Sequence, residues 1–265
     1  MNAEHSASVR KVVSQGEWLA ARRDLLNEEK ALTKHQQRVA ARRRELPWIA
    51  VTKDYVFDAP GGTVRLADLF AGRSQLIVKH NMLNPQHDVC VGCSFEMDAI
   101  EGARVHLEHH DVSIVAVSRA PLAQIQAAQK RMGWTTPWVS SIDSDFNYDF
   151  HVSFRREDIA RGEVFYNYEV AASPMEDLSG FSVFHKDENG GVFHTYGTFG
   201  RGAEYVMTAY VFLDMTPKGR NETGRGNLSD WVRPHDRYDV PGYTNSIGQF
   251  VAEENCCHPS RGEDR

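Results

Sequence analysis

Hydrophobic residues recur at every seventh position through the first part of the chain. They are Trp18, Leu25, Leu32, Val39 and Leu46. Ser14 precedes Glu17 by three positions, which is the pattern of a capping box at a helix start, and Pro47 follows the last member of the series. The pattern therefore predicts one long helix over residues 14–46, so that residues 1–46 form an N-terminal helical extension.

The predicted helix is apolar along one narrow stripe only. The facing heptad positions hold Arg22, Glu29 and Gln36, so a complete coiled-coil seam is not expected. A helix with a single apolar stripe buries that stripe against another surface. Here this surface is either the chain's own domain or a second subunit, and a homodimer formed through the helix is one of the two expectations.

Short apolar runs separated by turn residues follow the extension. They predict one hairpin over residues 55–66 and a second over residues 181–196, the latter around a Gly-Gly turn at 188–191. Between the hairpins, buried strands alternate with helices in the order strand 75–78, helix 94–109, strand 112–117, helix 121–131 and strand 138–139. This is the order of an α/β protein with parallel crossovers, and we expect its domain to span residues 47–240.

The other segments have weaker patterns. Residues 143–180 are aromatic and irregular, and residues 201–213 favour a helix. Glycine, proline and charged residues then dominate, so residues 241–265 are expected to form a polar, disordered tail. Cys256 and Cys257 in this tail could act as a resolving pair or as extra metal ligands, although an incidental role is the simpler interpretation.

Composition and charge narrow the class of protein. The chain has 265 residues, of which 41% are hydrophobic and 25% charged, as in soluble globular proteins. No run approaches the roughly 18 apolar residues of a membrane helix, and the start resembles no secretory signal, so a cytoplasmic protein is expected. Residues 1–46 carry ten Lys and Arg against six Asp and Glu, so that of the total charge of −6 the rest carries −10. Such an acidic body argues against nucleic-acid binding.

Two of the four cysteines, Cys90 and Cys93, form a Cys-x-x-Cys pattern between a predicted strand and a predicted helix. The free N–H groups and the dipole of a helix start stabilise a thiolate on the first cysteine. One turn on, Cys93 is close enough to attack a mixed disulfide. His87 could act as a base or, when protonated, favour the thiolate, whereas Asp88 would disfavour it. In a βαβ unit the pattern predicts a thioredoxin-like redox pair, with two buried inert cysteines as the alternative.

The histidines offer a second interpretation of the same region. His80 lies just before the cysteine loop, His194 on the second hairpin and His235 near the C-terminus. Together with Cys90 and Cys93 they would supply soft ligands suited to copper or zinc. The chain has no glycine-rich phosphate loop, so a nucleotide cofactor is not indicated.

Several segments carry a resemblance to a known family. Two of them read Asp88-Val-Cys-Val-Gly-Cys-Ser-Phe95 and Trp231-Val-Arg-Pro-His-Asp-Arg-Tyr238. The others are residues 18–33, 45–48, 138–141, 145–150, 192–196, 201–202 and 213–214. Together they resemble the DUF899 family, a group of thioredoxin-like proteins distantly related to peroxiredoxins.

The resemblance implies a thioredoxin-like mixed sheet flanked by helices, with the N-terminal helical extension in front and the Cys pair at the active edge. Two departures limit what it implies about activity. Gly180 stands before the strand that starts at Phe181, where thioredoxins keep a cis-proline, so a thioredoxin-style substrate clamp is not expected. Pro85 precedes Cys90 by five residues with no Thr between them, unlike the peroxidatic motif, so peroxidase activity is not expected.

Three functions therefore remain open from the sequence. The first is a thiol-disulfide oxidoreductase in which Cys90 is the nucleophile, Cys93 the resolving residue and His87 a proton-transfer group, acting on a small-molecule or protein thiol or disulfide. The second is a copper or zinc protein that uses Cys90, Cys93, His80, His194 and His235. The third is a non-catalytic dimeric binding module.

Overall fold

The computed structural model describes residues 11–222 and 231–253. The chain divides into two compact units, Met1–Pro47 and Trp48–Arg265. No helix among the described residues is long and apolar enough to cross a membrane.

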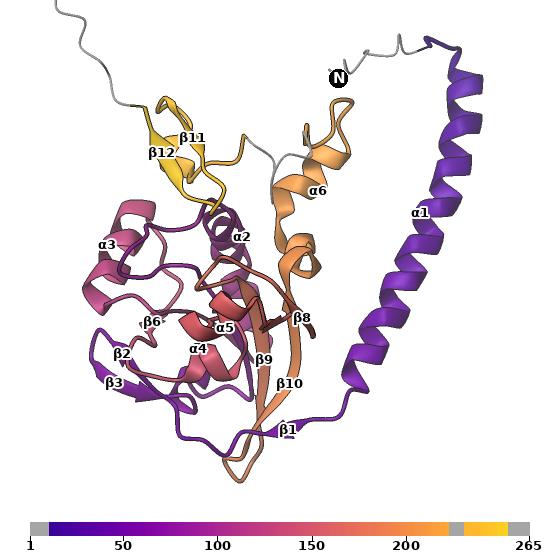
Figure 1. Cartoon of the computed structure of the whole chain (residues 1–265). Coiled ribbons are helices and arrows are strands. Elements are labelled where there is room, and N and C mark those ends of the chain that lie inside the picture. The colour runs from indigo at the N-terminus through magenta and orange to yellow at the C-terminus, as the bar shows by residue number, and fades with distance from the viewer. Residues whose placement is uncertain (1–10, 223–230, 254–265) are drawn as a thin grey trace, which may run out of the picture. The chain divides into compact units, whose positions relative to one another are not determined.

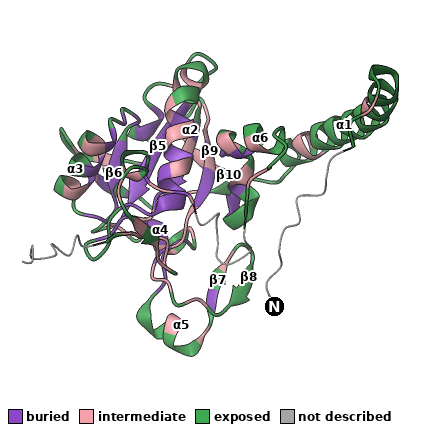
Figure 2. Cartoon of the chain, turned by 90° about the horizontal axis from the view of Figure 1, so that it is seen from above, coloured by how far each residue is buried: buried purple, intermediate pink, exposed green. Residues whose placement is uncertain are grey.

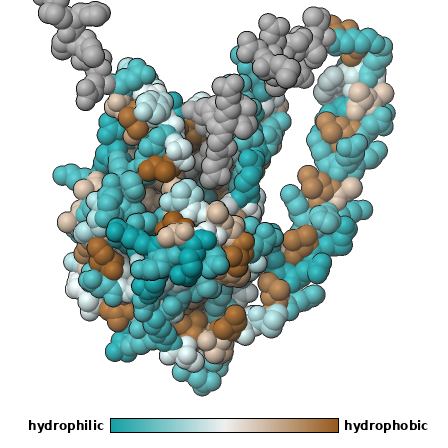
Figure 3. All heavy atoms as spheres, viewed as in Figure 1, coloured by the Kyte–Doolittle hydropathy of each residue, from teal (hydrophilic) through white to brown (hydrophobic). Residues whose placement is uncertain are grey.

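The described residues of the first unit form one helix, α1 (Gln15–Arg44). Its N-terminus has the predicted capping box, because the Ser14 hydroxyl accepts the N–H of Glu17 while the Glu17 carboxylate accepts the N–H of Ser14. Figure 3 shows apolar side chains at intervals along this helix, where Trp18 and Leu32 are more than half exposed. The predicted helix is confirmed, and the homodimer stays a prediction.

The second unit is built on one mixed sheet of eight strands (Figure 1). In spatial order the strands are β1 (Ile49–Ala50), β10 (Val192–Phe199), β9 (Gly180–Lys186), β4 (Gln75–His80), β5 (Val112–Ser118), β6 (Trp138–Ser140), β2 (Val56–Ala59) and β3 (Gly62–Arg65). β4, β5 and β6 run parallel, whereas β9 is antiparallel to β4 and β10 is antiparallel to β9. Both predicted hairpins are present, as β2–β3 and β9–β10.

The centre of the sheet has the thioredoxin-like arrangement. The parallel pair β4 and β5 is joined by α2 (Val91–Glu108), and the hairpin β9–β10 returns beside β4, which gives the order β5-β4-β9-β10. Further helices, among them α3 (Leu122–Met132), complete the layers around it. The expected α/β fold, a thioredoxin-like mixed sheet flanked by helices, is confirmed.

The two faces of the sheet bury different cores, because alternate residues of a strand point to opposite sides. On one face α2 and α3 pack through Met97, Ile100 and Ile125. On the other face the side chains come from the first hairpin, from the short helix η1 (Asp68–Phe70) and from α4 (Phe146–Asp149). Figure 2 shows the sheet and the inner side of α2 as the buried centre of this unit.

Three segments differ from the sequence prediction. Residues 143–180 are not irregular throughout, since they contain α4, α5 (Arg156–Arg161) and the hairpin β7 (Val164–Tyr166)–β8 (Glu169–Ala171). The helix expected over residues 201–213 is divided into η2 (Gly200–Val206) and α6 (Thr208–Asp214).

The third difference concerns the predicted disordered tail, residues 241–265. After the turn η3 (His235–Arg237), β11 (Gly242–Thr244) and β12 (Phe250–Ala252) pair as a hairpin, so the prediction is wrong up to residue 253. The reason is tertiary: Val232 is fully buried against Val91 at the start of α2, and Phe250 packs against the same cluster. Cys256 and Cys257 lie outside the described residues.

Candidate functional site

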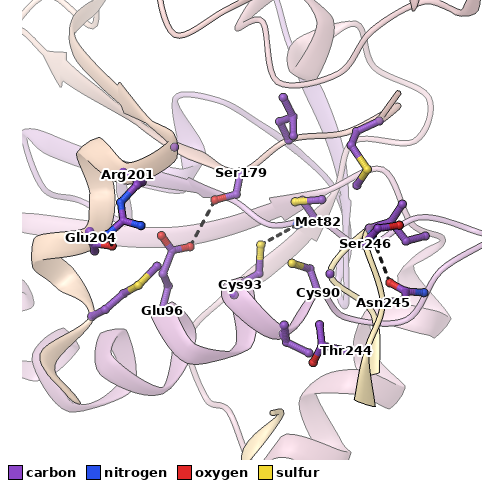
Figure 4. Close-up of a pocket in the computed structure, with 18 of the residues that line it drawn as sticks. Met82, Cys90, Cys93, Glu96, Ser179, Arg201, Glu204, Thr244, Asn245 and Ser246 are labelled. Carbon is purple, nitrogen blue, oxygen red and sulfur yellow. Dashed lines mark hydrogen bonds and ion pairs between the residues drawn. The ribbon is translucent and has the colours of Figure 1, made fainter. Parts of the chain in front are cut away.

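The Cys pair occupies the first turn of α2, which begins three residues before the position predicted from the sequence. Cys90 is the N-cap residue with an extended backbone, and its carbonyl accepts the N–H of Ser94 at 2.9 Å. Cys93 follows within the turn. Both are free thiols, and only 8% of Cys90 and 1% of Cys93 is exposed. Figure 4 shows the two sulfur atoms side by side above the end of the helix.

The surroundings of Cys90 favour its thiolate. The side chain of Cys93 donates a hydrogen bond to its sulfur, and the backbone N–H groups of Cys93 and Gly92 add further hydrogen bonds. These, with the positive charge of Lys79, outweigh burial and lower the pKa of Cys90 to about 7. Two of these contacts come from backbone N–H groups at the helix start, the kind of group expected to favour a thiolate there.

Cys93 has the opposite environment. Burial raises the pKa of its thiol well above the ordinary value, and the neighbouring Cys90 raises it further. Its sulfur also accepts the N–H of Met82 at 3.3 Å. Because one thiol ionises easily and the other holds its proton, the pair has the asymmetry that a nucleophile and a resolving thiol require.

A buried ion pair lies beside Cys93. Lys79 of β4 and Glu96 of α2 approach to 2.5 Å, with side chains that are 0% and 3% exposed. The Lys79 Nζ atom lies 3.9 Å from the Cys93 sulfur and 3.1 Å from the hydroxyl of Ser179. Burial alone would lower the pKa of Lys79, but the neighbouring Cys93 and Glu96 raise it, so the ammonium stays charged.

Sequence reasoning missed this ion pair. The available signals were a lysine directly after the apolar residues 76–78 of β4 and a glutamate three residues after Cys93 in the same helix. Neither indicates the other, because the contact joins a strand to a helix.

A cavity of about 460 Å³ opens over the Cys pair. Much of its wall is apolar, from Met82, Val91, Met175, Leu178, Met207 and Ile247. Arg201 and Glu204 stand on one side of the cysteines, and Thr244, Asn245 and Ser246 on the other (Figure 4). Arg201 is bonded to Glu204 at 2.7 Å, so the charges on that side are already paired.

His87, the predicted proton-transfer residue, lies in the loop before Cys90. Its side chain is exposed, its backbone N–H donates to Asn84 and its carbonyl accepts the amide of Gln124. Among the described residues that line the cavity, His87 does not occur. Asp88, expected to disfavour the thiolate, is paired with Arg131 at 3.1 Å.

The structure does not assemble the predicted copper or zinc ligands. His80 and His194 lie on the face of the sheet opposite the Cys pair, where His80 stacks with Phe150 and His194 meets the same ring edge-on. His235 bonds to Asp98 on the outer side of α2, at 2.7 Å. Within residues 11–222 and 231–253, no three His, Cys, Asp or Glu side chains are grouped as metal ligands would be. The sheet separates His80 and His194 from the cysteines, and His235 is held by Asp98, which is why the proposed set does not form.

The strand that starts at the active edge also departs from thioredoxins, as expected. The residues before Phe181 are Ser179 and Gly180, and the described residues contain no cis peptide bond. The Ser179 carbonyl instead accepts the hydroxyl of Tyr166 at 2.7 Å.

The profile of one protein family matches most of the chain. This family, described as bacterial protein of unknown function (DUF899), matches residues 7–238. No curated protein matches the chain.

Solved structures show a low-level likeness. A bacterioferritin comigratory protein of Xanthomonas campestris, whose structure is described for its alkyl peroxide reduction, is 14% identical with a TM-score of 0.40, over 61% of this chain and 96% of that one. The peroxidoxin BcpB of Mycobacterium tuberculosis is 13% identical with a TM-score of 0.39, over 62% and 94%. Identities and TM-scores this low say nothing about the activity of this chain.

Proposed function

This chain belongs to the DUF899 family of bacterial proteins, and we propose that it is a thiol-disulfide oxidoreductase whose reactive groups are Cys90 and Cys93. The observation that carries the proposal is the placement of two free thiols in the first turn of α2, at the wall of a cavity, beside a buried ammonium group. A protein with this activity works with reduced thiols, which is consistent with the expected cytoplasmic location.

The reaction has two exchange steps. The Cys90 thiolate attacks one sulfur of the substrate disulfide, so that a bond from Cys90 to this sulfur forms and the other half leaves as a thiolate. The Cys93 sulfur then attacks Cys90, which releases the second half and closes a disulfide between Cys90 and Cys93. The substrate gains two electrons, which the two cysteines supply.

The buried ion pair has a role in the second step. Cys93 must lose its proton before it can attack, yet burial raises its pKa. The Lys79 ammonium, 3.9 Å away, stabilises the thiolate as it forms, and Glu96 holds this ammonium in place at 2.5 Å. The proton that Cys93 loses leaves on the second half of the substrate, which is released as a thiol. His87 is not among the described residues that line the cavity, so it could transfer a proton to or from the cysteines only after a movement of its own loop. We therefore expect His87→Gln to change the rate of disulfide reduction by less than about threefold.

Trapping of the intermediate tests the proposal. The experiment uses a Cys256→Ser/Cys257→Ser background, so that only Cys90 and Cys93 remain, and it follows the mass of the intact protein after a small disulfide is added. We expect the background protein to lose two hydrogens as its internal disulfide closes, and Cys93→Ser to accumulate the mixed disulfide on Cys90. Cys90→Ser should form neither product. A Cys90→Ser protein that accumulates a mixed disulfide on Cys93 as fast as Cys93→Ser accumulates one on Cys90 would reject Cys90 as the nucleophile.

The dimer is a separate proposal that rests on α1. Trp18 and Leu32 lie on the seven-residue stripe and are more than half exposed in a single chain. If light scattering shows that the intact chain is a dimer, deletion of residues 1–46 should therefore give a monomer. The same number of subunits per particle for both proteins would remove the helix as the interface.

A further inference from the structure

A tight turn covers the reactive cysteine. The turn is residues 245–248, between β11 and β12, and the Gly248 carbonyl accepts the N–H of Val91 at 2.8 Å. Gly248 lies so close to Cys90 that a Cβ atom on it would come within 3.1 Å of the Cys90 sulfur. Its φ of +76° is also one that glycine adopts readily. The turn thus closes one approach to Cys90.

The turn is held by its own hydrogen bonds. The Asn245 side-chain oxygen accepts the N–H groups of Ile247 and Gln249, and the N–H of Gly248 donates to the Asn245 carbonyl. The strands on either side are paired through residues 242–252. Figure 1 shows this hairpin at the end of the domain where α2 starts.

The segment before the hairpin is anchored as well. The Arg233 guanidinium bonds to the Gly242 carbonyl and the Thr244 hydroxyl, and its Cζ atom stacks 5.6 Å from the centre of the Phe250 ring. Val232 is fully buried in the cluster that includes Val91 and Phe250. The covering turn is therefore a built part of the domain.

A covered nucleophile restricts the kind of disulfide it can attack. The attacking thiolate must reach one sulfur in line with the breaking bond, and only 8% of Cys90 is exposed. A disulfide in a folded protein brings backbone on both sides of each sulfur, and this bulk meets the turn at 245–248. The cavity of about 460 Å³ lies in the range of small-molecule sites, so a small disulfide can enter it.

The wall of the cavity indicates the charge of the substrate. Methionine, leucine and isoleucine side chains supply much of its surface, and Arg201 is already paired with Glu204. The buried Lys79 is likewise paired with Glu96. An anionic substrate would find no unpaired cation among these groups, whereas an uncharged apolar one would replace water against the methionine side chains.

We infer that the site reduces low-molecular-weight, uncharged disulfides and excludes the disulfides of folded proteins. The inference rests on the proposed function and uses the same two exchange steps, in which the substrate is released as two small thiols and the Cys90–Cys93 disulfide forms.

Substrate selectivity tests the inference. The reduced Cys256→Ser/Cys257→Ser protein is mixed with dithiodipyridine, which is uncharged, with dithiobis(nitrobenzoate), which is a dianion, and with insulin. Each rate is divided by that of glutathione with the same disulfide, because the three differ in intrinsic reactivity. The ratio for dithiodipyridine should exceed the other two ratios by at least about tenfold.

A cavity-filling variant links the selectivity to the site. Leu178→Trp places an indole in the cavity and should lower the dithiodipyridine rate by at least about tenfold, with the pKa of Cys90, followed by thiolate absorbance, unchanged. The matched control is Val170→Trp, an exposed position on β8 outside the cavity, which should react like the parent protein.

The outcomes separate the two proposals. Equal ratios for insulin and dithiodipyridine, or a Leu178→Trp protein as fast as the parent, would overturn the inference and leave the oxidoreductase intact. If none of the three disulfides closes the Cys90–Cys93 bond, the proposed function itself fails.

Discussion

Lys79 and His80 are neighbours on β4 that point to opposite faces of the sheet, and both are buried. Lys79 meets Glu96 and keeps its positive charge. His80 bonds to the hydroxyl of Ser182 at 2.8 Å and lies among aromatic rings, and burial lowers its pKa to about 3. The two side chains are equally buried, yet Lys79 is charged and His80 is neutral. They differ in their partners, because Lys79 meets a carboxylate and His80 meets a hydroxyl.

The two faces are therefore suited to different tasks. The Lys79 face gathers both thiols, a carboxylate and the larger cavity. The His80 face has a second cavity of about 400 Å³ lined by Tyr55, Phe150 and His194, where the His194 ring meets Phe150 edge-on and burial lowers the pKa of His194. The second cavity also has an ion pair, Lys53 with Asp149 at 2.7 Å, but no cysteine is among the described residues that line it.

The largest expected effect comes from breaking the ion pair. Lys79→Met leaves the Glu96 carboxylate buried without its partner, which should lower the free energy of unfolding by about 3–5 kcal/mol. Lys79→Met/Glu96→Leu removes both charges and should recover most of this loss. Urea unfolding followed by circular dichroism measures both variants.

Lys130→Met is the control for the ion pair, because Lys130 is an exposed residue of α3. It should change the free energy of unfolding by less than about 0.5 kcal/mol. A Lys79→Met protein as stable as Lys130→Met would mean that Glu96 loses nothing with its partner, and this would contradict a stabilising role for the ion pair.

The second effect is on the other face and depends on pH. The pKa of His80 is about 3 in the folded protein and 6.5 ordinarily, so acid protonates His80 in the unfolded chain first and favours unfolding as the pH falls below about 6.5. Between pH 7 and pH 5 this costs about 2 kcal/mol. His80→Phe removes the titrating group and should make the unfolding free energy less dependent on pH by that amount. Parallel pH profiles for the two proteins would contradict a neutral, buried His80.

The smallest effect distinguishes the two faces by reactivity. Alkylation of Cys90 by iodoacetamide should speed up as the pH rises through about 7, because the thiolate is the reacting form. In Lys79→Met/Glu96→Leu the pKa of Cys90 should rise, and the rate at pH 6 should fall by a few-fold, up to about tenfold. His80→Phe should react like the parent protein, since its change is on the opposite face. An equal shift in both variants would show that the two faces do not act separately.

Local patterns in the sequence predicted most of the elements of the domain. The capping box at Ser14, the buried run at 112–117 and the hairpin around 188–191 are all found where expected. The position of Cys90 at a helix start was predictable for the same reason, because a strand, a loop and an apolar helix pattern are adjacent in the chain.

Contacts between distant segments could not be predicted in this way. Lys79 and Glu96 meet only because β4 and α2 pack together, and the turn at 245–248 is ordered only because Val232 and Phe250 bury themselves at the start of α2. The metal hypothesis failed on the same point. His80 and Cys90 are close in sequence but lie on opposite sides of one sheet. The sequence near His80 does not show on which side of the sheet the following cysteine loop packs.

The central claim is that Cys90 and Cys93 exchange electrons as a pair. A redox titration tests it most directly, in which the Cys256→Ser/Cys257→Ser protein is equilibrated with glutathione buffers of increasing oxidation and its free thiols are counted by mass after alkylation. We expect one reversible two-electron transition, in which both thiols disappear together and reappear on reduction. Two thiols that stay reduced in every buffer, or a cysteine that only carries glutathione without an internal disulfide, would contradict it.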